Sequence, residues 1–80
     1  MPKRIPSMKP RELIRLIESM GCFFYGQGKG DHTLYARHAG DQKRVAPVDM
    51  GQTEYSPAYV LRVLRQFGFT DSEINEMFSR

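Results

Sequence analysis

Residues 22–48 of this 80-residue chain contain three short strand-like runs that follow one another directly. The runs cover Cys22–Gln27, His32–Arg37 and Lys43–Val48. They are separated by a Gly28–Gly30 bend and by the sequence Ala39-Gly40-Asp41, and glycine favours such turns because it adopts positive φ angles readily. Three short strands in succession predict an antiparallel meander. This prediction restricts the fold more than any other feature of the sequence.

The pattern within each run predicts where the strand lies. Residues 22–25 are continuously apolar, so we expect the first strand to be covered on both faces or to lie inside the sheet. Alternation in the second run places His32, Leu34 and Ala36 on one face and Thr33, Tyr35 and Arg37 on the other. Both faces contain apolar side chains, so alternation alone does not identify the buried face. Pro47 lacks an N–H group, which predicts that the third strand lies at an edge or leaves the sheet there.

An amphipathic helix is expected before the strands, over about Lys9–Met20. Ser7 is the expected N-cap. Pro10 fits the first helical turn, where its missing N–H group is not needed. Gly21 is the expected end of this helix.

Two further helices are expected after the strands. Ser56-Pro57 combines an N-cap with a proline at the first helical position and predicts a helix that runs to about Phe67, with Gly68 ending it. Thr70 and Glu73 form the Thr-x-x-Glu pattern of a capping box, which predicts a short third helix through Phe78.

The order of elements is therefore α-β-β-β-α with a short trailing helix. It predicts an α+β fold in which both main helices cover one face of a three-stranded antiparallel sheet and leave the other face free. Residues 1–7 contain two prolines and no periodicity, and we interpret them as an irregular N-terminal arm. Residues 8–80 form a single domain, as the length of the chain favours.

Composition places the chain among ordinary globular domains, with 40% hydrophobic and 26% charged residues. No apolar run approaches the roughly 20 residues that cross a bilayer, and no apolar stretch follows the basic start as in a signal peptide. We therefore expect a cytoplasmic protein without a membrane partner. The single Cys22 cannot form an internal disulfide and is expected to be a small buried hydrophobic residue.

The net charge is +3, and the excess of positive charge lies in the first fifty residues. This bias favours a polyanionic partner such as a nucleic acid, although mildly basic surfaces also occur in proteins that bind none. The potential ligands, two histidines and several aspartates, show no metal-site spacing. We expect neither a metal ion nor a small-molecule cofactor.

His32 is the candidate catalytic residue, because it follows a flexible, basic glycine bend at the start of a strand. It is either an incidental turn residue or a general acid/base. One reaction within reach of so short a chain is transfer of an RNA phosphodiester to its own 2′-hydroxyl, since the substrate supplies the nucleophile. Lys29 and the amides of Gly28 and Gly30 are candidate phosphate ligands.

Further residues are candidates for contacts with the rest of an RNA. The cations that could hold its backbone are Arg37, Lys43 and Arg44, and Tyr25 or Tyr35 could stack on a base. The alternative for each is an ordinary solvated charge or a core aromatic ring.

The sequence resembles the HicA toxin family over roughly residues 8–68. The segments that carry the resemblance are Lys9-Pro10-Arg11-Glu12-Leu13-Ile14, Gly28-Lys29-Gly30-Asp31-His32, the turn after His38, Arg44-Val45-Ala46-Pro47 and Leu61-Arg62-Val63-Leu64-Arg65-Gln66. The resemblance implies a fold like that of double-stranded-RNA-binding domains and a metal-independent ribonuclease, an mRNA interferase. It also implies a HicB-like antitoxin as partner and carries the family's catalytic histidine over onto His32.

The chain departs from the family's pattern at two places. Asp31 stands where the family usually has serine, and its carboxylate would favour a protonated His32 yet repel a phosphate if the side chains meet. Val48-Asp49 follows Pro47 where the family often has histidine. Two alternatives to a nuclease therefore remain: an RNA-binding module without catalytic activity, and a module that binds only its protein partner.

Overall fold

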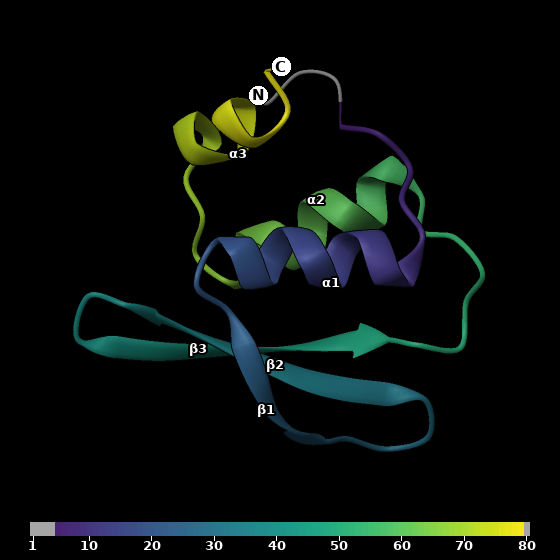
Figure 1. Cartoon of the computed structure of the whole chain (residues 1–80). Coiled ribbons are helices and arrows are strands. Elements are labelled where there is room, and N and C mark those ends of the chain that lie inside the picture. Colours follow the sequence, from purple (N-terminus) through teal and green to yellow (C-terminus); the bar gives the residue numbers. More distant parts are fainter. Residues whose placement is uncertain (1–4, 80) are drawn as a thin grey trace.

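The computed structural model describes residues 5–79 and confirms the α+β fold. The elements are α1 (Pro10–Ser19), β1 (Phe23–Gln27), β2 (His32–Ala39), β3 (Gln42–Asp49), α2 (Pro57–Gln66) and α3 (Asp71–Met77). The strands form one antiparallel sheet in the order β1-β2-β3. Figure 1 shows α1 and α2 on one side of this sheet, with α3 farther out on the same side. Within the described residues, the other face of the sheet carries no helix, and we call it the open face.

The N-cap of α1 is Lys9, so the prediction of Ser7 was wrong. Pro10 occupies the first helical position and disfavours a helical conformation in the residue before it, which leaves Lys9 extended. The Glu12 carboxylate then accepts the Lys9 N–H at 2.8 Å. Gly21, with φ +95°, ends the helix as predicted.

Residues 5–7 have no regular secondary structure, and Ile5 packs against the core. Residues 1–4 of the expected arm lie outside the described part of the chain. Met8 then forms an antiparallel bridge with Tyr55 through backbone bonds of 3.1 and 2.7 Å. The bridge ties the start of the domain to the segment before α2.

The prediction for β1 was wrong, because it is an exposed edge strand. Phe23, Phe24 and Tyr25 are 37%, 60% and 47% exposed. The pairing with β2 shifts between Phe24 and Gly26, so Tyr25 is the extra residue of a β-bulge. A continuous apolar run is typical of a buried strand, but here its large side chains remain at the surface.

Packing shows which face of β2 and β3 is buried, a question that the alternation of the sequence did not answer. The β2–β3 hairpin has a two-residue turn at Gly40-Asp41, with Gly40 at φ +64°. Tyr35, Ala46 and Val48 belong to the core beneath the helices. The helix-facing residues are therefore Thr33, Tyr35 and Arg37 of β2 and Arg44, Ala46 and Val48 of β3. The open face contains His32, Leu34, Ala36 and His38 of β2 and Lys43, Val45, Pro47 and Asp49 of β3.

The edge position that Pro47 predicted for β3 is confirmed. The Asp49 N–H points away from β2 and donates to the Tyr59 hydroxyl at 2.9 Å. Because N–H groups of alternate residues point to the same side of a strand, the nitrogen of Pro47 also points outward. No ladder bond is lost at Pro47, since that side has no neighbouring strand.

The predicted caps of the later helices are confirmed. The Ser56 Oγ accepts the Tyr59 N–H at 3.2 Å, and the Thr70 Oγ1 accepts the Glu73 N–H at 3.1 Å. Ile74 of α3 is fully buried in the core cluster. Helix α3 therefore adds a buried residue to the single core.

Candidate functional site

The bend before His32 is held by backbone bonds. The Gly28 N–H donates to the His32 carbonyl at 2.9 Å, and the His32 N–H donates to the Lys29 carbonyl at 3.0 Å. The side-chain amide of Gln27 also donates to the His32 carbonyl, at 2.9 Å. A Cβ atom at Gly28 would lie 3.2 Å from that carbonyl oxygen, so glycine permits the close approach. The main chain of His32 is therefore fixed on both of its polar atoms.

The side chain of His32 lies on the open face and is exposed, and Lys29 is exposed in the same bend. Gly30 adopts φ +57°, which closes the bend. The Gly28 N–H is occupied by the His32 carbonyl and is not available to a ligand. Among residues 5–79, the N–H groups of Lys29 and Gly30 have no hydrogen-bond partner. The bend thus offers one ammonium and two amide donors beside an exposed imidazole.

Asp49 lies directly opposite His32 on β3. Its carbonyl accepts the Tyr55 hydroxyl at 2.6 Å and its N–H donates to Tyr59, two rings that stack with centroids 4.6 Å apart. Its carboxylate accepts the Gly51 N–H at 2.9 Å and the Gln52 amide at 3.0 Å. These two bonds, and then the positive charge of His32, lower the pKa of Asp49. Asp49 is therefore a fixed, ionised carboxylate that faces the histidine.

Sequence reasoning missed Asp49 as a neighbour of His32, because the predicted third strand ended at Val48. The signal was the Asp-x-Gly spacing, in which an aspartate caps the N–H group two residues later. Asp31, the expected carboxylate neighbour of His32, instead packs against Gly51, where an added Cβ would lie 2.5 Å from its Oδ2. Its carbonyl accepts the Met50 N–H at 2.9 Å. The carboxylate that lies directly across from His32 on the neighbouring strand is that of Asp49.

The remaining predicted contacts do not all gather around His32. Lys43 lies on the open face, opposite His38 at the far end of β2. His38 lies six positions after His32 along β2, which is about 20 Å at the rise of a strand. Tyr25 is exposed on the same face as Lys43, whereas Tyr35 is buried, and burial together with the Glu18 carboxylate raises its pKa. Only Tyr25 is accessible to a base.

Arg37 and Arg44 lie on the helix-facing side, away from His32. The Arg37 guanidinium donates to the Phe67 carbonyl at 3.0 Å and lies 3.9 Å from the centre of the Phe69 ring. Its side chain is 16% exposed and pairs with Glu73 at 3.5 Å. Arg44 is exposed beside Gly68. We expected Arg37 to hold RNA, but its donors are directed toward the ends of α2 and α3.

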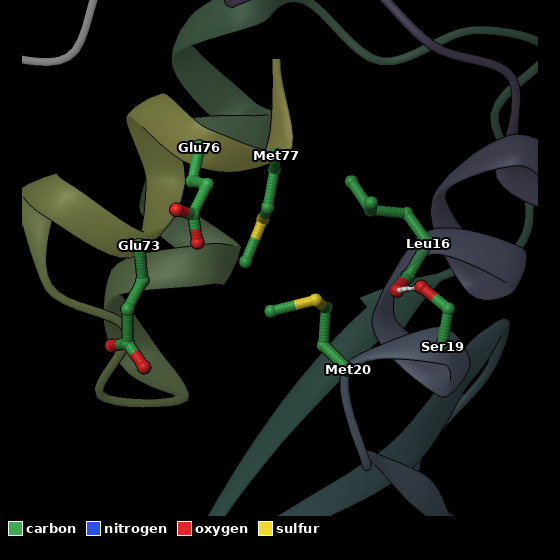
Figure 2. Close-up of a pocket in the computed structure, with 6 residues that line it drawn as sticks. All are labelled: Leu16, Ser19, Met20, Glu73, Glu76 and Met77. Atoms are coloured by element: carbon green, nitrogen blue, oxygen red, sulfur yellow. Dashed lines mark hydrogen bonds between the residues drawn. The ribbon is translucent and has the colours of Figure 1, made fainter. Parts of the chain in front are cut away.

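His32 does not line either of the two hollows that follow. One hollow, of about 340 Å³, lies between α1 and α3. Figure 2 shows Leu16 and Met20 on one side of it and Glu73, Glu76 and Met77 of α3 on the other. A second, of about 810 Å³, runs along α1. Carboxylates make the first hollow unsuitable for a phosphate. The candidate site is thus a surface of the sheet rather than a cavity.

Over the described range, no three His, Cys, Asp or Glu side chains are grouped so that they could hold a metal ion. None of the described helices is long and apolar enough to cross a membrane.

The fold and the site define an α+β domain with an exposed, backbone-fixed histidine on an uncovered sheet face. In comparisons with known proteins, no family model, no curated protein and no solved structure matches the chain.

Proposed function

We propose that the chain is the toxin of a HicAB-type toxin-antitoxin system, a metal-independent endoribonuclease that cleaves mRNA with His32 as general acid/base. The observation that carries the proposal is the exposed imidazole of His32, fixed at its backbone beside Lys29 and two unpaired amides. The α-β-β-β-α order supports it, because the resemblance to HicA toxins implies this order of elements. The partners are mRNA and a HicB-like antitoxin.

The reaction requires a proton acceptor, a proton donor and a ligand for negative charge. Neutral His32 takes the proton of the 2′-hydroxyl as its oxygen attacks phosphorus. The bond to the 5′-oxygen then breaks, and the proton on His32 passes through solvent water to that oxygen, which leaves a cyclic phosphate and a free 5′-hydroxyl. Lys29 and the amides of Lys29 and Gly30 hold the phosphate oxygens that gain charge. Asp49, ionised and fixed across the sheet, stabilises the imidazolium formed on His32. No other protein group has to act as nucleophile.

The structure also limits which cations belong to this proposal. Lys29 is at the site, and Lys43 is on the same face. Arg44 is exposed on the helix-facing side and can reach the RNA only around the β3 edge. Arg37 is left out of the proposal, because its guanidinium is held on the other side of the sheet.

Wild type, His32→Ala and Lys29→Gln test the proposal when expressed without an antitoxin. We expect growth arrest and shortened cellular mRNA with wild type, neither with His32→Ala, and a weakened effect with Lys29→Gln. Because the His32 side chain is exposed, its removal should change the free energy of unfolding by only about 0.5 kcal/mol. Thermal unfolding of the purified variants is the control.

Equal growth arrest by wild type and His32→Ala would overturn the catalytic role of His32. If neither protein arrests growth in the absence of an antitoxin, the proposal that the chain is a toxin is overturned. RNA binding that weakens with salt, survives His32→Ala and leaves the RNA length unchanged would instead establish an RNA-binding module without activity.

A further inference from the structure

A cluster of aromatic and basic side chains lies on the open face and extends from the middle of the sheet, at Tyr25, to the end opposite His32, at His38 and Lys43. We call it the far-end cluster; it consists of Phe23, Tyr25, His38 and Lys43. The rings of Phe23 and His38 stack with centroids 5.4 Å apart. The Lys43 ammonium lies 4.3 Å from the centre of the Tyr25 ring and donates to its hydroxyl at 3.0 Å. The cluster thus contains two preformed pairs, Phe23 with His38 and Tyr25 with Lys43.

The contact between Tyr25 and Lys43 depends on the small residue between them. Tyr25 is on β1 and Lys43 on β3, so their side chains meet only by crossing over β2. Ala36 of β2 lies on the open face yet is fully buried, with Phe23 and Val45 as its neighbours in register. A larger residue at position 36 would separate the two side chains. The short alanine therefore lets a cation and aromatic rings share one surface.

The far-end cluster has the properties of a site that stacks unpaired bases. Phe23 is 37% and Tyr25 47% exposed, although their rings are large and apolar. Lys43 forms no ion pair with any described residue, so its positive charge is not balanced within residues 5–79. None of the four members is acidic, and Asp41 in the hairpin turn is the nearest carboxylate in sequence. Exposed rings beside an unbalanced cation fit a polyanion that carries flat rings.

We propose that the far-end cluster binds a single-stranded segment of RNA that flanks the bond cleaved at His32, with bases stacked on Tyr25 and Phe23 and a phosphate on Lys43. This inference rests on the proposed ribonuclease function for the placement of the cleaved bond. The open face between the two ends is apolar, at Leu34, Ala36, Val45 and Pro47. A single strand fits this surface better than a duplex, because the bases of a duplex are paired and stacked inside it.

The distance from His32 to the far end of β2 determines how long an RNA must be to contact both places. His32 and His38 are about 20 Å apart along β2. A dinucleotide bound at His32 does not reach Lys43, whereas a strand of about twelve nucleotides covers both His32 and the whole cluster. The cluster is thus a positioning site for long substrates rather than part of the reacting centre.

Binding of an unstructured, fluorescein-labelled RNA of about twelve nucleotides tests the inference by fluorescence anisotropy. All variants carry His32→Ala to prevent cleavage. We expect Tyr25→Leu and Lys43→Gln each to raise Kd about fivefold or more, because one stacked base or one phosphate contact is lost. Tyr25→Phe, which keeps the ring, should bind like the His32→Ala parent. Lys43→Gln should also reduce the slope of log K against log salt concentration by about 0.7.

The chain offers matched controls for both changes. Phe24 is the neighbouring aromatic residue of β1, is 60% exposed and points to the opposite face, where its ring meets Tyr35. Arg62 is an exposed cation of α2 and therefore not on the open face. Phe24→Leu and Arg62→Gln should change Kd less than twofold and leave the salt slope unchanged.

The outcomes separate this inference from the proposed function. If the protein with His32 intact cleaves RNA, but Tyr25→Leu and Lys43→Gln bind it as tightly as their controls, the far-end cluster is overturned and the ribonuclease stands. If the two variants lose binding but no cleavage occurs, the cluster stands and the ribonuclease falls. Tighter binding of a duplex than of a single strand would also overturn the cluster. So would variants Tyr25→Leu and Lys43→Gln that lose binding to a protein partner but keep their affinity for RNA. Should Tyr25→Leu fail to fold, Lys43→Gln alone carries the test.

Discussion

Arg37→Met tests the conclusion that this arginine holds the fold together rather than holding RNA. The change removes a charged hydrogen bond to the Phe67 carbonyl, worth about 1.5–3 kcal/mol. It also removes the contact with the Phe69 ring, worth about 0.5–1 kcal/mol, while the partly exposed pair with Glu73 adds less than about 1 kcal/mol. Met restores some packing on the ring. We expect a net loss of about 2–4 kcal/mol in the free energy of unfolding.

That loss is large for an 80-residue domain, whose total stability is about 4–12 kcal/mol. It corresponds to a fall in Tm of about 10–25 °C. Urea unfolding followed by circular dichroism measures it, with Arg15→Met as the control, because Arg15 is an exposed residue of α1 and should change stability by only about 0.5 kcal/mol.

RNA affinity is the second measurement on Arg37→Met. At a temperature where the variant is folded, its Kd for RNA should match that of the parent, because the guanidinium is on the helix-facing side of the sheet. Unchanged stability together with weakened RNA binding would refute the structural role.

Three further predictions concern a glycine, two carboxylates and the cysteine. Gly68→Ala should lower the free energy of unfolding by about 1–2 kcal/mol, because Gly68 has φ +85°. Gly26→Ala is the control and should not, since Gly26 has no positive φ and a Cβ there would meet no atom within 4 Å. A similar Tm for the two variants would refute the backbone strain at position 68. Hydrogen bonds from Gly51 and Thr70 lower the pKa of Asp49 and Glu73, respectively. The two ionised carboxylates therefore stabilise the fold above about pH 4, and this contribution is lost as pH falls through their folded pKa values. The difference in Tm between wild type and Asp49→Asn should shrink at low pH, and a constant difference would contradict this. Burial raises the pKa of Cys22 to about 11, so a thiol reagent at neutral pH should label the native protein far more slowly than the urea-unfolded protein, and equal rates would refute the burial.

The sequence predicted those features that depend on neighbouring residues. The helix starts at Ser56-Pro57 and Thr70, the Gly40 turn and the order of elements all follow from local hydrogen bonding and φ preference. The prediction of Ser7 as the N-cap of α1 failed because the Lys9 N–H donates to the Glu12 carboxylate, so that Lys9 is the N-cap instead.

Features that depend on distant contacts could not be read from the sequence. The burial of Arg37 is decided by Phe67, Phe69 and Glu73, which lie 30 or more residues away along the chain. The exposed position of β1 has the same origin, because an apolar run does not reveal whether another layer will cover it. At the candidate site, the placement of His32 beside Lys29 was predictable, whereas Asp49 became its neighbour only through the pairing of β2 with β3.

The two edges of the sheet differ in how readily they could accept a strand from another copy of this chain. At the β3 edge Pro47 has no N–H group, and both backbone groups of Asp49 are taken by tyrosine hydroxyls. Strand addition is therefore disfavoured at the Pro47–Asp49 end of this edge. The same tyrosines that position the carboxylate opposite His32 thereby make that end of the sheet a poor template for aggregation.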